Sequence, residues 1–126
     1  MRKHAIATDD AGPPAGPYSQ GVRAGPFVFL AGQIPAGPDG KLIGGDFETQ
    51  ARQVLTNLAA IAAAAGSSLA DAVQVGVYLN SRDDFAAMND LFAEHFPPPR
   101  PARTTIQTQL PGFAIEIDAV LLAPSS

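Results

Sequence analysis

Hydrophobic positions along the chain predict alternating strands and helices. The apolar run FVFLAGQI (27–34) lies between prolines and is typical of a buried strand. The segment AGPDGK after it contains the glycine, proline and aspartate that turns require. From Phe47 to Ala65, apolar residues recur with the i, i+4, i+7 spacing of an amphipathic helix. Asp46 is suited to cap the start of this helix and Gly66 its end.

The second half of the chain continues this alternation. Apolar residues at period two predict a half-buried strand in 71–80, with these side chains on its buried face: Val73, Val75, Val77 and Leu79. Ser81 and Asp84 resemble a capping box, and the second helix that follows ends at His95, before the prolines at 97–99. Segments 103–110 and 113–122 alternate around Pro111-Gly112, which predicts a closing β-hairpin.

This order of elements predicts an α+β fold with one mixed sheet and both helices packed on one face. The 126 residues suffice for one domain, 1–126, and contain neither an internal repeat nor a linker. Because so short a chain has no third layer, the opposite sheet face lacks a cover. A partner subunit is the economical way to bury that face.

Composition narrows the classes of function. The net charge of −4 disfavours nucleic acid as a partner, since phosphate backbones attract clusters of Lys and Arg. The chain has no cysteine, which excludes disulfides and thiolate chemistry. Its N-terminus lacks the apolar segment of a secretory signal, and no apolar run is long enough to span a bilayer. We therefore expect a soluble, cytoplasmic protein.

Arg103, in RPARTT (100–105), is the first candidate for a binding role. Its planar guanidinium can hold a carboxylate through two parallel hydrogen bonds, and the prolines before it stiffen the segment that carries it. The alternative is a surface arginine at the start of a strand.

Glu116 is the second candidate. Ile115 and Ile117 share one strand face, so Glu116 belongs to the other, which is either solvated or covered by a neighbouring subunit. In the covered case burial would raise its pKa and suit it to proton transfer. If the last two strands form a hairpin, Glu116 and Arg103 can reach one region, with Thr105 as a polar neighbour of Arg103.

Other candidates are polar or unusually small residues beside apolar segments. Tyr18 and Asn89 are either ligand contacts or packing residues. Gly32, inside an apolar strand, indicates either close approach of a ligand or a β-bulge. The two histidines have no metal-ligand spacing, and the sequence contains neither a serine triad nor a glycine-rich phosphate loop.

Several of these segments occur in an order that resembles the Rid family, the reactive intermediate deaminases also called the YjgF or L-PSP family. The segments are GPYSQGV, AGQIP, QARQVLTNLAAIAAAAG, FAAMN, PAR and IEIDAV, and the resemblance extends from Ile6 to Leu122. It implies a fold similar to the bacterial chorismate mutase type and a homotrimer with sites between subunits. It also implies hydrolysis of 2-imino acids, such as 2-iminopropanoate and 2-iminobutanoate, to 2-keto acids and ammonia without a cofactor.

The resemblance also implies roles for individual residues. Arg103 of the PAR motif would hold the substrate carboxylate, and Glu116 would position and activate the attacking water. The remaining residues would line the cleft or offer main-chain groups to substrate or water: Tyr18, Asn89, Gly32 and Thr105.

The chain departs from the family pattern at three places that bear on substrate range. Thr105 stands where many members have cysteine, Gly76 where a hydroxyl residue is frequent, and Arg100 is an additional arginine near the cleft. Two other functions stay open: a carboxylate-binding regulatory module without turnover, and an endoribonuclease, which the acidic balance disfavours.

Overall fold

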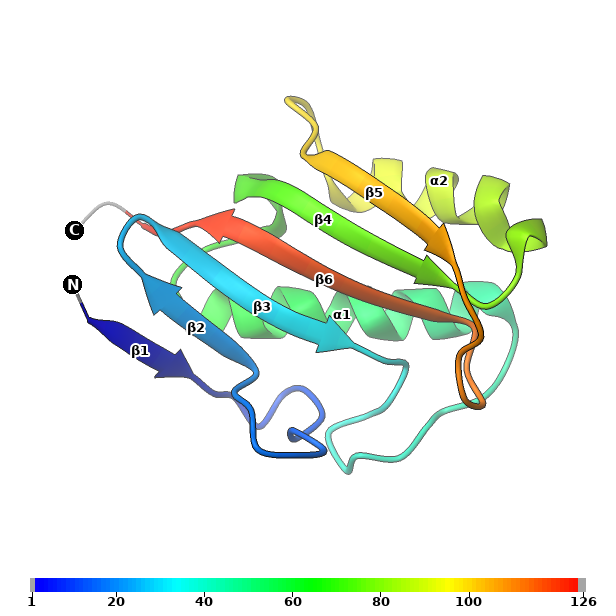
Figure 1. Ribbon diagram of the computed structural model, residues 1–126, viewed down its shortest axis with the longest axis horizontal. Coiled ribbons are helices and arrows are strands. Elements are labelled where there is room, and N and C mark those ends of the chain that lie inside the picture. The colour runs from blue at the N-terminus through cyan, green and yellow to red at the C-terminus, as the bar shows by residue number, and fades with distance from the viewer. Residues whose placement is uncertain (1, 125–126) are drawn as a thin grey trace.

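The computed structural model describes residues 2–124 as a six-stranded sheet with two α-helices packed against one of its faces (Figure 1). This arrangement confirms the predicted α+β class. The elements are β1 (Lys3–Ile6), β2 (Gly21–Ala24), β3 (Phe27–Gln33), α1 (Phe47–Ala64), β4 (Ala72–Leu79), α2 (Phe85–His95), β5 (Ala102–Gln107) and β6 (Ile115–Leu122).

The sheet has the strand order β1-β2-β3-β6-β4-β5. Every neighbouring pair is antiparallel except β4 and β5, which are parallel and joined by α2 as a crossover. The predicted hairpin of β5 and β6 is therefore wrong, because β4 lies between them. Alternate side chains of β6 are buried along most of its length. A central position between two neighbouring strands buries more of this apolar surface than an edge position would.

The core lies between the sheet and α1. The apolar face of α1 contributes Val54, Leu58 and Ile61, which are fully buried, and these side chains pack in one cluster with residues of the central strands, such as Val75 and Ile117. Both predicted caps of this helix are confirmed. Asp46 accepts a hydrogen bond of 2.9 Å from the Thr49 N–H, and Gly66, just beyond the helix, has a φ of +74°.

The structure corrects three details of the predicted elements. Strands β1 and β2, with four residues each, are too short to produce a clear apolar pattern, and β1 is also mostly exposed. Val73 is 37% exposed, because an irregularity in the pairing of β4 with β6 puts Ala72 on the buried face in its place. Ser81 caps a single 3-10 turn (82–84) by accepting from the Asp83 N–H, so the predicted capping box is incomplete.

The sheet face opposite the helices exposes large apolar side chains. Phe29 and Ile106 are 46% and 47% exposed, and Phe27 and Leu122 are paired beside each other on the same face. This open face is the one for which the sequence predicts a covering subunit. No helix within residues 2–124 has the length and apolar content to cross a membrane.

Candidate active site

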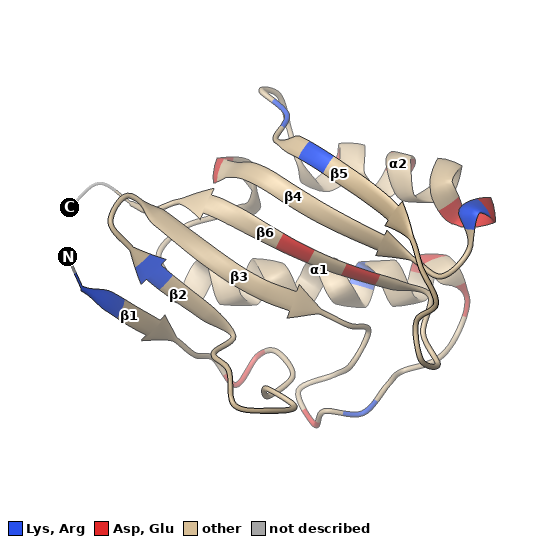
Figure 2. Ribbon diagram, in the orientation of Figure 1, with Lys and Arg blue, Asp and Glu red and all other residues tan. Residues whose placement is uncertain are grey.

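The strand register places Arg103 and Glu116 on opposite faces of the sheet. Arg103 pairs with Val75, which is buried beneath the helices, whereas Glu116 pairs with Tyr78 on the open face. The basic segment of β5 and the acidic segment of β6 are also separated by β4 (Figure 2). The expectation that both side chains reach one region within a chain is therefore wrong, and its cause is the misassigned hairpin.

Aromatic and sulfur groups of α2 hold the Arg103 side chain in place. Its Cζ lies 4.8 Å from the ring centre of Phe92 and 5.9 Å from that of Phe85, and Nη1 lies 3.6 Å from the Met88 Sδ. Between residues 2 and 124, the ion pairs involve Arg52 and not Arg103. The guanidinium is thus half-buried and oriented without an anionic partner, which leaves its fork free for an external carboxylate.

Two other candidates lie near Arg103. Asn89 lines the same surface hollow as Arg103 and Arg100. Arg100 donates to the carbonyl oxygens of Ala93 and Phe96, so it caps the C-terminal end of α2 as well as bordering the hollow. On β5, the buried hydroxyl of Thr105 has no hydrogen-bond partner among residues 2–124. Such a hydroxyl has an unmet capacity to donate or accept a hydrogen bond.

Glu116 is a half-buried carboxylate to which no hydrogen bond or ion pair is formed from residues 2–124. Burial raises its pKa above the ordinary 4.5, and the neighbouring charge of Asp118 raises that pKa further. Asp118 differs, because it accepts hydrogen bonds from the Gly76 N–H at 3.0 Å and from the Tyr78 hydroxyl at 3.4 Å. Of these two acids on β6, Glu116 is therefore the one available for proton transfer.

Gly32 allows Glu116 to occupy its position. The pairing of β3 with β6 shifts between Leu30 and Gln33, so Gly32 lies in a β-bulge. A Cβ atom on residue 32 would overlap the Glu116 Oε2 and crowd the rest of the carboxylate. The interpretation of this glycine as a bulge is confirmed, and the group that approaches residue 32 is the Glu116 side chain and not another backbone.

We expect Gly32→Ala to displace the Glu116 carboxylate and to lower the activity proposed below by at least about 10-fold in kcat, since small displacements of a catalytic group are costly. Gly37→Ala is a matched control, because its Cβ would meet the nearest atom, an Asp39 oxygen, at 3.4 Å, which is ordinary contact. Steady-state kinetics of the two variants measure the difference. Equal activity in both would contradict a role for Gly32 in placing Glu116.

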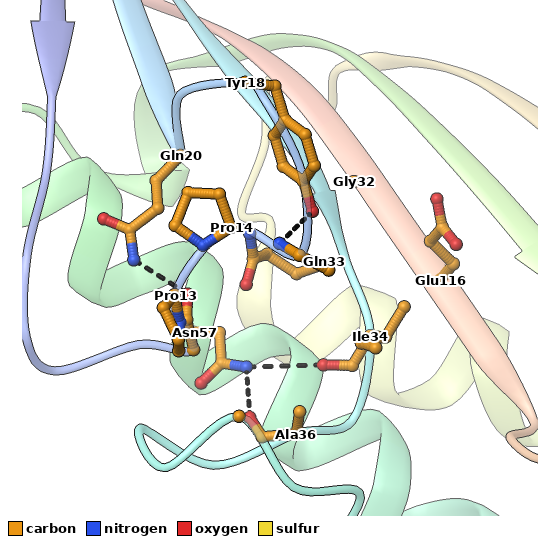
Figure 3. Close-up of a pocket in the computed structure, with 13 residues that line it drawn as sticks. Pro13, Pro14, Tyr18, Gln20, Gly32, Gln33, Ile34, Ala36, Asn57 and Glu116 are labelled. Carbon is orange, nitrogen blue, oxygen red and sulfur yellow. Dashed lines mark hydrogen bonds between the residues drawn. The ribbon is translucent and has the colours of Figure 1, made fainter.

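A cavity of about 160 Å³ extends from Glu116 and Gly32 beneath the 12–18 loop (Figure 3). Tyr18 lies at its rim, 51% exposed, with its hydroxyl oxygen accepting a hydrogen bond of 3.1 Å from the Ala15 N–H. The candidates thus form two groups in each chain. One contains Arg103, Asn89 and Thr105, and the other contains Glu116, Gly32 and Tyr18.

Sequence reasoning missed three polar residues of this cavity: Gln20, Gln33 and Asn57. The signal was present, since Gln33 is a polar residue at the end of an apolar strand. Strand alternation alone would put residue 33 on the open face with Phe27 and Phe29, whereas the bulge turns it to the helix side, where it pairs with Ile117.

Comparisons with known proteins identify the family. The family model described as Endoribonuclease L-PSP matches residues 8–123. A RutC family protein from Pyrococcus horikoshii is 48% identical over 121 residues, covering 94% of this chain and 96% of that protein. A protein from Dermatophagoides farinae named 2-iminobutanoate/2-iminopropanoate deaminase is 37% identical over 123 residues, covering 95% and 96%.

A solved structure agrees with these sequence relatives. The crystal structure of RidA from an Antarctic Psychrobacter bacterium superposes with a TM-score of 0.89 at 40% identity, covering 94% of this chain and 98% of that one. Sequence similarity to these relatives therefore extends over nearly the whole chain, and the fold is shared with the solved structure over nearly its whole length. The chain belongs to the Rid family, also called the L-PSP family.

Proposed function

We propose that the protein hydrolyses reactive 2-imino acids, such as 2-iminopropanoate and 2-iminobutanoate, to 2-keto acids and ammonia. The observation that carries this proposal is the pair of half-buried, oppositely charged groups, Arg103 and Glu116, neither of which has an ionic partner within residues 2–124. A substrate with a carboxylate and a hydrolysable C=N bond needs a cation to bind the carboxylate and a base to activate water. The relative named as a deaminase supports this reaction class.

We further propose that each site forms between two subunits of a homotrimer. Because Arg103 and Glu116 lie on opposite sheet faces, one chain cannot present both to a substrate as small as 2-iminobutanoate. The exposed apolar side chains on the sheet face that carries Glu116, such as Phe29 and Ile106, favour a neighbouring chain over this face. In this arrangement Arg103 of one subunit meets Glu116 of the next.

The proposed mechanism requires an oriented substrate and one group that takes up and returns protons. Arg103 holds the substrate carboxylate, and Glu116 takes a proton from water as the water oxygen bonds to the carbon of the iminium group. The π electrons of the C=N bond move to nitrogen, which gives a neutral carbinolamine. Glu116 then returns its proton to nitrogen, the C–N bond breaks and ammonia leaves. The hydroxyl proton passes to Glu116 as the C=O bond forms, and from there to solvent.

A coupled assay tests this function. An amino-acid oxidase generates the imine, and semicarbazide traps whatever is not hydrolysed. We expect added protein to lower semicarbazone formation and to raise the yield of 2-keto acid and ammonia. Unchanged yields would contradict the deaminase proposal, and retained binding of 2-oxobutanoate would then identify a binding module. Cleavage of RNA that is lost in Arg103→Ala would instead favour a ribonuclease.

A further inference from the structure

Two carboxylates lie on the open face of β6, two residues apart. Glu116 and Asp118 alternate with buried residues of this strand, and both are half-buried (Figure 2). Alternate residues of a strand are separated by about 7 Å between their Cα atoms, so two flexible acidic side chains can approach much more closely than that. A nearby negative charge raises the pKa of a carboxyl group. The direction in which each side chain lies therefore affects the chemistry of the other.

A glycine on each neighbouring strand leaves space for one of the two carboxylates. Glu116 lies over Gly32 of β3, where an added Cβ atom would overlap its Oε2. Asp118 lies over Gly76 of β4, where an added Cβ atom would overlap its Oδ1 and lie 3.2 Å from its Cγ. Because β6 runs between β3 and β4, the two acids lean to opposite sides of their own strand.

Hydrogen bonds hold Asp118 on the β4 side. The Gly76 N–H donates to its Oδ1 at 3.0 Å, and the Tyr78 hydroxyl donates to its Oδ2 at 3.4 Å. Gly76 is also the residue of β4 that pairs directly with Asp118. A side chain at position 76 would occupy the space of the Asp118 carboxylate, which would then turn toward β3, the side on which Glu116 lies.

The titratable groups that face Glu116 come from three elements. They are Tyr78 of β4, which pairs directly with it, Asp118 of its own strand, and Tyr18 at the rim of its cavity. Strand β3 has no charged residue. The described linings of this cavity and of the hollow beside Asp118 contain no Lys, Arg or His. Within one subunit, Asp118 is therefore the charge that adds to burial in raising the pKa of Glu116.

We propose that Gly76 is a positioning residue for Glu116, because the space that it leaves keeps the charge of Asp118 on the β4 side, away from the reacting carboxylate. The inference rests on the proposed function, in which Glu116 is the base. It also gives a physical role to glycine at a position where a hydroxyl residue is frequent in the Rid family.

The kinetic test is Gly76→Ala. This variant should fold, because the φ of residue 76 lies outside the left-handed region and the group in the way is the end of a side chain. A closer Asp118 charge raises the pKa of Glu116, so the base is lost at a higher pH. We expect the ratio of kcat/KM on the acidic limb to kcat/KM near neutrality to fall by about 3- to 10-fold from the wild-type ratio.

The same change in the Asp118→Asn background separates charge from shape. There the added Cβ atom displaces a neutral amide, so Gly76→Ala should leave the acidic limb where Asp118→Asn alone puts it. An acidic limb that moves equally in both backgrounds, or in neither, would overturn the inference.

An NMR titration tests the inference without turnover. The side-chain carboxyl carbon of Glu116, assigned with Glu116→Gln, is followed against pH in the wild-type protein and in Gly76→Ala. We expect its midpoint to move to higher pH in Gly76→Ala. In Gly37→Ala, a loop variant whose added Cβ atom meets its nearest neighbour at 3.4 Å, the midpoint should stay in place.

The titration separates this inference from the proposed function. An unchanged midpoint in Gly76→Ala would overturn the role of Gly76 even if imines are hydrolysed. A raised midpoint together with no hydrolysis of any imine would overturn the deaminase proposal and keep the role of Gly76 in placing the two acids.

Discussion

Replacing Arg103 by alanine is expected to lower kcat/KM for 2-iminobutanoate by about 10²- to 10³-fold, because the substrate carboxylate loses its charged partner. Most of the loss should appear in KM, since the arginine holds a group that does not react. Arg103→Lys should recover only part of it. Lysine keeps the charge, but it has neither the planar fork nor the flat face that lies over Phe92. Steady-state kinetics with the coupled assay measure both variants.

Mixing two impaired variants tests whether the site is shared between subunits. In Arg103→Ala the glutamate is intact, and in Glu116→Gln the arginine is intact. After joint refolding of equal amounts, a site that takes one residue from each neighbour is complete with a probability of about one quarter. We therefore expect about 25% of wild-type activity from the mixture. Activity no higher than that of the separate variants would contradict a shared site.

Glu116→Gln is expected to lower kcat by about 10²- to 10⁴-fold, the range usually contributed by a positioned acid or base. The amide has nearly the same shape and cannot take a proton from water, so KM should change little. Steady-state kinetics over a range of imine concentrations measure kcat and KM separately. A loss confined to KM would show that Glu116 binds substrate and does not transfer protons.

Asp118→Asn is the matched control on the same strand face, and it also tests the pH dependence. In the proposed mechanism Glu116 is a base, so activity should fall as the pH drops through its pKa, which burial and the Asp118 charge raise above 4.5. Asparagine removes the charge and can still accept from the Gly76 N–H. The acidic limb of the kcat/KM profile should therefore move to lower pH, while activity near neutrality is retained. A shift to higher pH would contradict the assigned cause.

The helices and the fold class could be predicted because their signals are local. The apolar spacing from Phe47 onward and the cap at Asp46 are properties of neighbouring residues, and the structure agrees with them. Strand order is not a local property. The pattern around Pro111-Gly112 is compatible both with a hairpin and with two strands separated by β4, and only the packing of the whole sheet decides between them.

The candidate site could likewise be predicted only as far as its signals are local. The residue types at Arg103 and Glu116 suggested their chemistry, and the family motifs located them, but the face on which each lies depends on a register that one sequence does not reveal. Gln33 escaped notice for a related reason, since a bulge changes which residues of a strand share a face.

The irregular pairing at Gly32 gives two adjacent residues different surroundings. Residue 32 leaves room for the Glu116 carboxylate on the open side of the sheet, and residue 33 pairs with Ile117 and faces the helices. The two positions therefore tolerate different changes. Any side chain at position 32 would displace the acid, whereas a side chain at position 33 lies on the other face of the sheet, so neighbouring codons of this strand are under unequal constraint.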